Sequence, residues 1–325
     1  MNLNKLTFMI IMMMSTVMTL SSSSWLGMWM GLEMNLMSFI PLMYNQNNLK
    51  SSQAMMIYFL TQSISSMIML FSMISIMMMS STLIKEMAKI SIMISIMIKI
   101  GMPPFHSWMP EVMGALAWMP IFMLSTWQKM GPLFILSTVI SSPTIYLFII
   151  SGSLISAIGG INVTSTRKIM AYSSMSHLSW MSMLMTTSMN WYKYMMMYSM
   201  MMSMMCYNFH NYNFYFMNQI NSKIPIMGKM SMSIMLLSLG GMPPMLGFLP
   251  KWMVIQTMLY NNMYLLMMFM LLMSLITLFY YMRLISSLML SFSSTSKMIN
   301  TKNNYTTLTM MINLMLPLFS VMNII

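Results

Sequence analysis

Four ionisable side chains lie inside long apolar runs, where a charge is costly to place. They are Glu33 in "WMGLEMNLMSF", Lys99 in "IMIKIGMPP", Lys129 in "STWQKMGPL" and Lys251 in "GFLPKWMVI". If the runs cross a membrane, each charge costs at least about 2.5–3.5 kcal/mol on insertion scales, which makes it a candidate functional residue. Burial favours the neutral amine of a lysine, and a nearby carboxylate favours the ammonium. Movement of Glu33 relative to Lys99 would therefore switch that lysine between holding and releasing a proton.

A buried lysine has an alternative use in membranes, because its long side chain can extend to the interface. For Lys251 this alternative stays open, since the stretch "FLPKW" could lie near a membrane edge. Lys99 and Lys129 lie too centrally in their apolar runs for the amine to reach an interface. The pattern therefore favours proton transfer at these two positions.

Two matching interruptions lie close to the lysines. "GMPPFHSWMP" starts at Gly101 and "GMPPMLGFLP" starts at Gly241, and in each a third proline follows six residues after the second. Glycine and tandem prolines break helices. Paired interruptions in corresponding places indicate a transport site between repeats, and the matched spacing disfavours simple proline kinks. The predicted helix breaks are at Gly101, Pro103, Pro104, Gly241, Pro243 and Pro244.

Two histidines are further candidates. His177 lies in "SSMSHLSWM", and the ordinary histidine pKa of about 6.5 suits a proton relay. A lone histidine in a membrane is equally compatible with a hydrogen-bonded packing residue, and both interpretations stay open. His106 follows the first interruption and could line the same cavity as Lys99.

The composition sets the class of protein that must position these residues. Of the 325 residues, 58% are hydrophobic and 6% are charged, against about 25% charged in soluble domains. So few charges cannot cover a soluble surface, which predicts an all-α polytopic membrane protein. The net charge of +12 comes from scattered residues rather than a dense patch, so no nucleic acid is expected as a partner.

Methionine and cysteine could hold a metal, but neither is expected to do so. The 63 methionines indicate an AT-rich genome in which AUA encodes Met, as in many animal mitochondria. Codon usage therefore explains the Met, Cys and His around Cys206 more simply than a Cu(I) site does. A single cysteine also excludes an intrachain disulfide.

About eleven apolar segments are long enough to cross a bilayer as helices. The connections between them leave no room for a soluble domain, so residues 1–325 form a single transmembrane domain. Lys and Arg number nine on the side of the N-terminus and three on the other, which predicts the N-terminus on the matrix side and the C-terminus on the intermembrane-space side. The predicted spans cover residues 4–22, 25–44, 54–80, 88–112, 115–138, 144–163, 169–188, 194–216, 229–257, 261–285 and 306–325.

Several stretches, in order along nearly the whole chain, match a known family. The chain resembles the antiporter-like family of membrane-arm subunits in respiratory complex I (NADH:ubiquinone oxidoreductase). Within that family it is similar to the subunit 2 sequences of animal mitochondria, in particular those of insects. The matching stretches are "SSWLGMWMGLEMNLMSFIPLM", "YFLTQS", "KIGMPPFHSWMPEVM", "TWQKMGPL", "AIGGINVTSTRKIMAYSSMSHLSWM", "LSLGGMPPMLGFLPKW" and "TLFYYMRL".

The resemblance implies an antiporter-like inverted-repeat fold and a role for each candidate. Two halves, roughly 1–140 and 141–285, would each contain one broken helix, and a C-terminal helix would cover 306–325. The first break and the second would then mark equivalent sites. The implied roles are an ion pair for Glu33 and Lys99, a central relay for Lys129, a terminal proton site for Lys251 and a place on the hydrated axis for His177.

The predicted function is proton translocation in the mitochondrial inner membrane, as a membrane-arm subunit of complex I. No cofactor is expected in this chain, because NADH, FMN, the iron–sulfur clusters and ubiquinone would be bound by other subunits. The expected partners are other membrane-arm subunits and membrane lipids such as cardiolipin. Two alternatives stay open: a structural spacer that transfers no protons, and a self-standing cation/proton antiporter.

Overall fold

The computed structural model describes most of the chain. The described residues are 3–44, 48–78, 81–140, 143–188, 190–217, 219, 226–290 and 304–313. Residues 314–325, which make up more than half of the last predicted span, lie outside the described residues.

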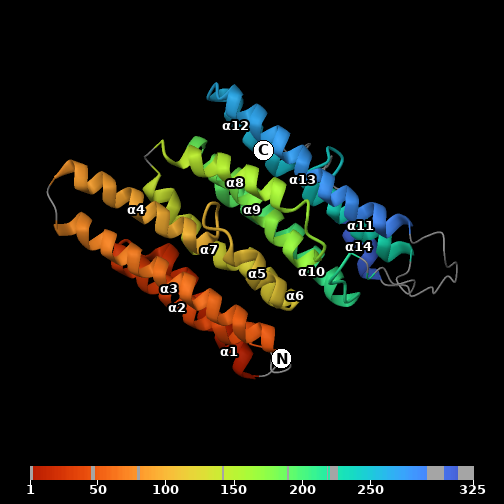
Figure 1. Cartoon of the computed structure of the whole chain (residues 1–325), viewed down its shortest axis with the longest axis horizontal. Helices are drawn as coiled ribbons and strands as arrows, with labels where there is room; N and C mark the ends of the chain where they lie inside the picture. Colours follow the sequence, from red (N-terminus) through yellow and green to blue (C-terminus); the bar gives the residue numbers. More distant parts are fainter. Residues whose placement is uncertain are drawn as a thin grey trace. The chain divides into compact units, whose positions relative to one another are not determined.

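The regular structure in these residues is helical, apart from one isolated β-bridge between Ser165 and Phe216. Figure 1 shows the helices coloured along the chain. They are α1 (Leu3–Ser21), α2 (Trp25–Met43), α3 (Leu49–Met78), α4 (Thr82–Ile100), α5 (Trp108–Ala115), α6 (Trp118–Ser125), α7 (Trp127–Val139), α8 (Ile145–Gly159), α9 (Thr166–Thr187), α10 (Trp191–Asn211), α11 (Ile226–Gly240), α12 (Phe248–Tyr260), α13 (Tyr264–Leu290) and α14 (Asn304–Asn313).

The chain divides into two compact units, which cover residues 1–148 and 149–325. In unit 1, α1 packs on α2, α3 packs on α4 and α5, and α7 contacts α1, α2 and α4. In unit 2, α9 contacts α10, α12 and α13, while α11 contacts α10, α13 and α14. Each lysine of interest therefore lies on a helix that has several neighbours within its own unit.

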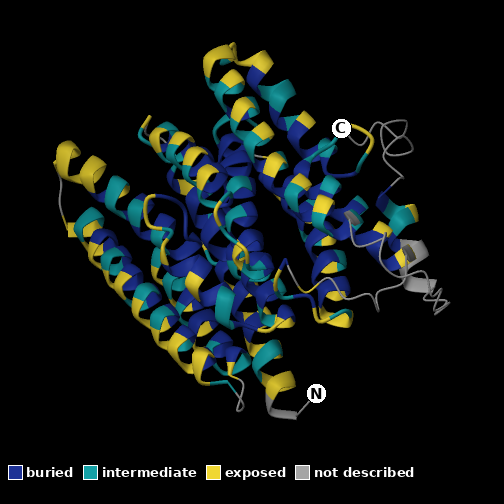
Figure 2. Cartoon of the chain, turned by 45° about the vertical axis from the view of Figure 1, so that its right-hand side comes forward, coloured by how far each residue is buried: buried dark blue, intermediate teal, exposed yellow. Residues whose placement is uncertain are grey.

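The outer faces of the helices are apolar. Figure 2 shows exposed residues along the outward sides of the helices and buried residues where helices pack on one another. Large side chains such as Phe71, Leu265 and Phe279 are exposed, and apolar surface on this scale is unusual for a soluble monomer. Two helices, Leu49–Met78 and Tyr264–Met289, are long and apolar enough to cross a membrane on length and composition alone.

Small residues allow the helices to approach closely. A Cβ on Gly31 of α2 would lie 2.4 Å from Cγ2 of Thr19 on α1, so this contact requires glycine. Many buried serines satisfy their hydroxyls inside their own helix; Ser95, for example, donates to the carbonyl of Ile92 at 2.7 Å. Such residues add close packing without leaving an unpaired polar group in an apolar interior.

The two Gly-Pro-Pro segments interrupt helices in the same manner. α4 ends at Ile100 and α5 begins at Trp108, whereas α11 ends at Gly240 and α12 begins at Phe248. Gly101 has a φ of 75° and Gly241 a φ of 79°, values in the left-handed region that glycine adopts at helix C-termini. The sequence therefore ends both helices with the same type of cap.

A third interruption differs from the sequence expectation. The segment predicted as one span over 115–138 is divided into α6 and α7 at Thr126. The carbonyl of Phe122 accepts from the Ser125 hydroxyl at 3.0 Å, the Thr126 hydroxyl at 2.7 Å and the Thr126 N–H at 3.1 Å. Hydroxyls that bond to the preceding turn bend helices. The helix is therefore interrupted, and α7 begins at Trp127, in the turn that carries Lys129.

Candidate functional site

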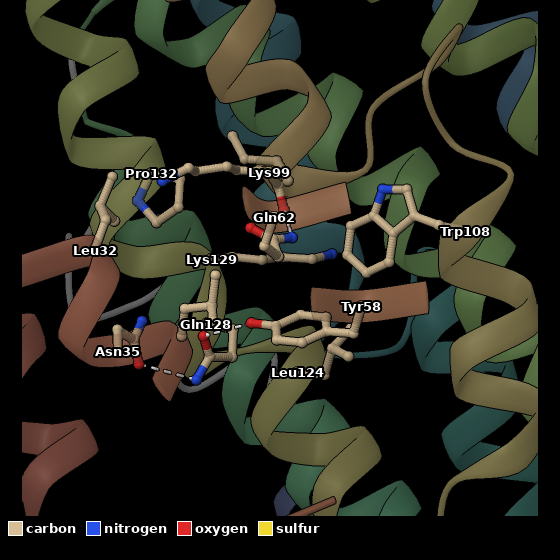
Figure 3. A pocket seen from close by; sticks show the side chains of 12 residues that line it. Leu32, Asn35, Tyr58, Gln62, Lys99, Trp108, Leu124, Gln128, Lys129 and Pro132 are labelled. Carbon is tan, nitrogen blue, oxygen red and sulfur yellow. Dashed lines mark hydrogen bonds between the residues drawn. The ribbon is translucent and has the colours of Figure 1, made fainter. Parts of the chain in front are cut away.

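Lys99 and Lys129 line the same small cavity in unit 1. Lys99 comes from α4 and Lys129 from α7, and their exposed fractions are 7% and 2%. The space open to the centre of a water molecule is about 20 Å³, and a polar cavity of roughly 10–15 Å³ by this measure can hold one water. Figure 3 shows the Lys129 side chain crossing towards Trp108 while Lys99 points towards Pro132. Two lysines from different helices thus share one polar, water-sized space.

The break after α4 is stabilised by hydrogen bonds to its last carbonyl groups. The N–H groups of Gly101 and Met102 both donate to Met97 O at 3.0 Å. The indole of Trp108 donates to Ile98 O at 3.1 Å, and the amide of Gln62 donates to Lys99 O at 3.1 Å. The end of this helix is therefore fixed from both α3 and α5, and the position of Lys99 is fixed with it.

Lys129 lies in the first turn of α7, next to a hydrogen-bonded glutamine. The Tyr58 hydroxyl donates to Gln128 Oε1 at 3.3 Å, and Gln128 Nε2 donates to Asn35 Oδ1 at 3.0 Å. These bonds, drawn in Figure 3, connect α3, α7 and α2 beside the cavity. Since α7 has no side-chain N-cap, Gln128 supplies the polar anchor that sets the start of this helix.

Glu33 does not form the direct ion pair with Lys99 that the resemblance implied. No N–O distance of 4.0 Å or less joins them in the described part of unit 1, although the Glu33 charge still acts on Lys99 through space. The reason is helix geometry. Leu32, Asn35 and Leu36 line the cavity at helical spacing, so Glu33, one residue on from Leu32, lies on the adjacent and half-buried face of α2.

The second break lies in unit 2 and carries Lys251 on the other side of the interruption. The N–H groups of Gly241 and Met242 donate to Leu237 O at 3.0 and 3.2 Å, which repeats the pattern at Gly101. Lys251 Nζ then donates to Gly240 O at 2.7 Å. It also lies 6.0 Å from the centre of the Trp180 ring, within cation–π range. The amine is buried at the break, which disfavours extension to an interface.

The two histidines have different environments. His177 on α9 is buried, and its Nδ1 lies 2.8 Å from the hydroxyl of Tyr194 on α10. His106 is half-exposed, with its Nδ1 3.2 Å from Pro104 O, and it does not line the cavity of Lys99 and Lys129. The expectation that it shares this cavity is therefore wrong, because the ring turns back on the unwound segment. The hydrogen bond of His177 is compatible with either a relay or a packing role.

The structure brings some candidates together within each unit and adds others. Lys99 and Lys129 share the cavity of unit 1, while Lys251 lies near Trp180, one helical turn from His177, in unit 2. The uncharged polar residues beside the lysines were not among the residues predicted from the sequence. The available signal was a hydrogen-bonding side chain within an apolar run, as at Asn35, Tyr58, Gln62 and Gln128.

Comparison with known proteins identifies the family. Residues 22–277 match the family of NADH:quinone oxidoreductase and Mrp antiporter transmembrane proteins. The NADH-ubiquinone oxidoreductase chain 2 of Aedes aegypti is 45% identical over 94% of this chain and 93% of its own length. The proteins of the same name from Anopheles gambiae and Bos taurus are 40% and 35% identical, over 92% and 91% of this chain and 89% and 90% of their own lengths.

Solved structures with low sequence identity share the fold. A chain of respiratory complex I from Thermus thermophilus has a TM-score of 0.83 at 15% identity, over 97% of this chain and 79% of that one. A chain of an archaeal membrane-bound sulfane sulfur reductase also reaches 0.83, at 14% identity, over 97% of this chain and 72% of its own. The chain belongs to the antiporter-like NADH:quinone oxidoreductase/Mrp family of membrane proteins, and within it to the mitochondrial NADH-ubiquinone oxidoreductase chain 2 group.

Proposed function

We propose that this chain is a membrane-arm subunit of respiratory complex I that moves protons through buried side chains. NADH oxidation and ubiquinone reduction in other subunits would drive the transfer. The observation that supports this most directly is the cavity that Lys99 and Lys129 share beside an interrupted helix. Lysines in a space that can hold water are able to exchange protons, whereas lysines in dry packing are not.

The proton relay consists of Glu33, Lys99, Lys129 and Lys251, with His177 as a further member. Glu33 acts on Lys99 through space, so a change in the local field can shift the proton affinity of Lys99 without an ion-pair contact. The proton then passes to Lys129 through the shared cavity and finally reaches Lys251 in unit 2. Each charge moved against the membrane potential requires about 2.3 kcal/mol per 100 mV, so an external driver is needed.

The finer architecture that we propose is an inverted repeat of halves near 1–140 and 141–285, in about eleven membrane spans. The identical cap hydrogen bonds at Gly101 and Gly241 support this proposal. The N-terminus would lie on the matrix side and the C-terminus on the intermembrane-space side of the mitochondrial inner membrane. Other membrane-arm subunits and lipids such as cardiolipin are the proposed partners. NADH, FMN, iron–sulfur clusters and ubiquinone would bind elsewhere in the complex.

The replacement Lys99→Met tests this function in the assembled complex. It removes the titrating amine but keeps an apolar side chain of similar length. We expect NADH oxidation to continue while the number of protons pumped per electron falls, because one route through the membrane is blocked. The measurement is the proton-to-electron ratio of purified complex I in vesicles.

Lys89→Met is the matched control, because Lys89 is exposed on the same helix. A ratio unchanged by Lys99→Met would contradict the proposal and favour the spacer alternative. Cation/proton exchange by the isolated chain in proteoliposomes would instead favour the self-standing antiporter.

A further inference from the structure

Two buried tyrosines contact His177 in unit 2, and two more lie close to that pair. Tyr194 and Tyr198 come from α10, and Tyr280 and Tyr281 come from α13. The His177 ring lies 4.8 Å from the Tyr198 ring, and the rings of Tyr280 and Tyr281 are 4.7 Å apart. Tyr194 is within electrostatic range of Tyr281, and Tyr198 is within range of Tyr280. These five side chains form one group, which we call the tyrosine cluster.

Two hydroxyls of the tyrosine cluster are buried and make no hydrogen bond of full geometry among the described residues. The Tyr280 and Tyr281 side chains are 0% and 1% exposed. Tyr281 and Ser176 lie close to the Tyr280 hydroxyl, and Ser173 lies close to the Tyr281 hydroxyl, but none of these contacts has the distance and angle of a full hydrogen bond. An unsatisfied buried polar group destabilises a protein by about 1–3 kcal/mol, so two such groups close together need an explanation.

The surroundings of these hydroxyls are polar on the α9 side. The Ser176 hydroxyl lies near the Tyr280 hydroxyl, and the Ser173 hydroxyl lies near the Tyr281 hydroxyl. Both serine protons are already used inside α9, since Ser173 donates to Met170 O at 2.8 Å and Ser176 to Ser173 O at 2.7 Å. The serine oxygens can still accept hydrogen bonds. A group that both donates and accepts, placed between the serines and the tyrosines, would satisfy both sides.

We propose that the hydroxyls of Tyr280 and Tyr281 bind internal water, and that this water forms a proton-conducting branch linking α13 to the His177–Tyr194 pair. Water fits the site because it both donates to the serine oxygens and accepts from the phenols. The conducting role rests on the proposed function, whereas the water site rests on the two orphan hydroxyls alone. In such a branch each oxygen accepts one proton and releases another, so no covalent structure changes overall.

A role in packing alone does not explain the hydroxyls. Phenylalanine would fill the same volume and leave no buried donor, and the removal of a polar group from a dry site is close to neutral or stabilising. Tyr280 also packs so closely that a Cβ on Gly160 would lie 2.6 Å from its ring. The ring contact therefore needs only the aromatic face, and the hydroxyl is available to bind water.

The test uses the assembled complex with the double replacement Tyr280→Phe and Tyr281→Phe. The matched control is Tyr264→Phe, which makes the same change on the same helix at an exposed residue whose hydroxyl bonds to Asn262. A high-resolution cryo-EM map should show ordered water within hydrogen-bond distance of both hydroxyls in the unaltered protein. We expect this density to disappear from the double variant, and its proton-to-electron ratio to fall below that of the control.

Two results would overturn the proposal. One is a map in which the tyrosine hydroxyls bond directly to Ser173 and Ser176 with no water between them. The other is a double variant that assembles and pumps as the Tyr264→Phe control does. A parallel Lys99→Met sample separates the two levels: if it too pumps normally, the proposed function fails, and the water density alone then decides whether the tyrosines bind water.

Discussion

At the scale of single residues, the lysines depend on uncharged neighbours. Gln128 lies directly before Lys129 and uses both ends of its amide, accepting from Tyr58 and donating to Asn35. Tyr58 and Asn35 are buried and Gln128 is half-buried, so the loss of one of the three would leave another unsatisfied. The amide network thus fixes the rotation of α7 and, through it, the place of the Lys129 amine.

Gly241 is the residue whose replacement should separate the amine of Lys251 from its carbonyl partner. A Cβ at this position would lie 2.8 Å from Lys251 Nζ. The left-handed φ of 79° adds roughly 1–2 kcal/mol of strain for a residue other than glycine. We expect Gly241→Ala to lower the proton-to-electron ratio and to destabilise the chain by about that amount, measured as a lower thermal midpoint of the complex.

The adjacent Gly240 supplies a control for this prediction. A Cβ on Gly240 would find its nearest neighbour at 3.5 Å, in Tyr281, which is an ordinary contact. Gly240→Ala should therefore pump and melt close to the unaltered protein. Equal behaviour of the two variants would show that the contact between Gly241 and Lys251 has no role.

At the scale of elements, the two helix breaks with glycine and tandem prolines could be predicted from the sequence, whereas the break at Thr126 could not. Gly101 and Gly241 are followed by tandem prolines, whose effect on a helix is local and can be read directly. The division at Thr126 depends on three donors converging on a single carbonyl, and Ser-Thr pairs elsewhere need not do this. The lack of an ion pair between Glu33 and Lys99 could not be predicted either. A shift of one residue along α2 turns a different side chain towards the cavity.

The turn between α8 and α9 is held to α13 by Arg283. Its guanidinium donates to Ile161 O and to Val163 O, the latter at 2.6 Å. Arg283→Lys keeps the charge but cannot form both bonds in the same planar geometry. We expect the local stability of the turn to fall by about 1.5–3 kcal/mol, the usual contribution of a hydrogen bond to a charged group.

The measurement for Arg283→Lys is limited proteolysis of the complex, followed by mapping of cuts near Ile161. The altered turn should be cleaved faster, while a control cut in another exposed loop keeps its rate. Cleavage at an unchanged rate would show that the close packing of Gly160 on Tyr280 holds the turn without the arginine.

At the scale of the whole molecule, each unit contains an interrupted helix and a buried lysine, but the chemistry is not the same in both. In unit 1 the lysine precedes the break and its carbonyl is bound by Gln62. In unit 2 the lysine follows the break and its amine binds the freed carbonyl of Gly240 directly. Similar backbone geometry therefore places the Lys99 amine in a cavity and the Lys251 amine at the break itself. Such a difference suits successive steps of one transfer better than two equal channels.

Combined replacement of Lys99 and Lys251 by methionine distinguishes one path from two. Groups that act in series are strongly non-additive, since either loss alone already stops the whole process. We expect the double variant to have the same proton-to-electron ratio as the more impaired single variant, measured in vesicles at matched rates of NADH oxidation. If the two losses add instead, each unit conducts protons by itself, and the relay from Lys129 to Lys251 is wrong even though both lysines carry protons.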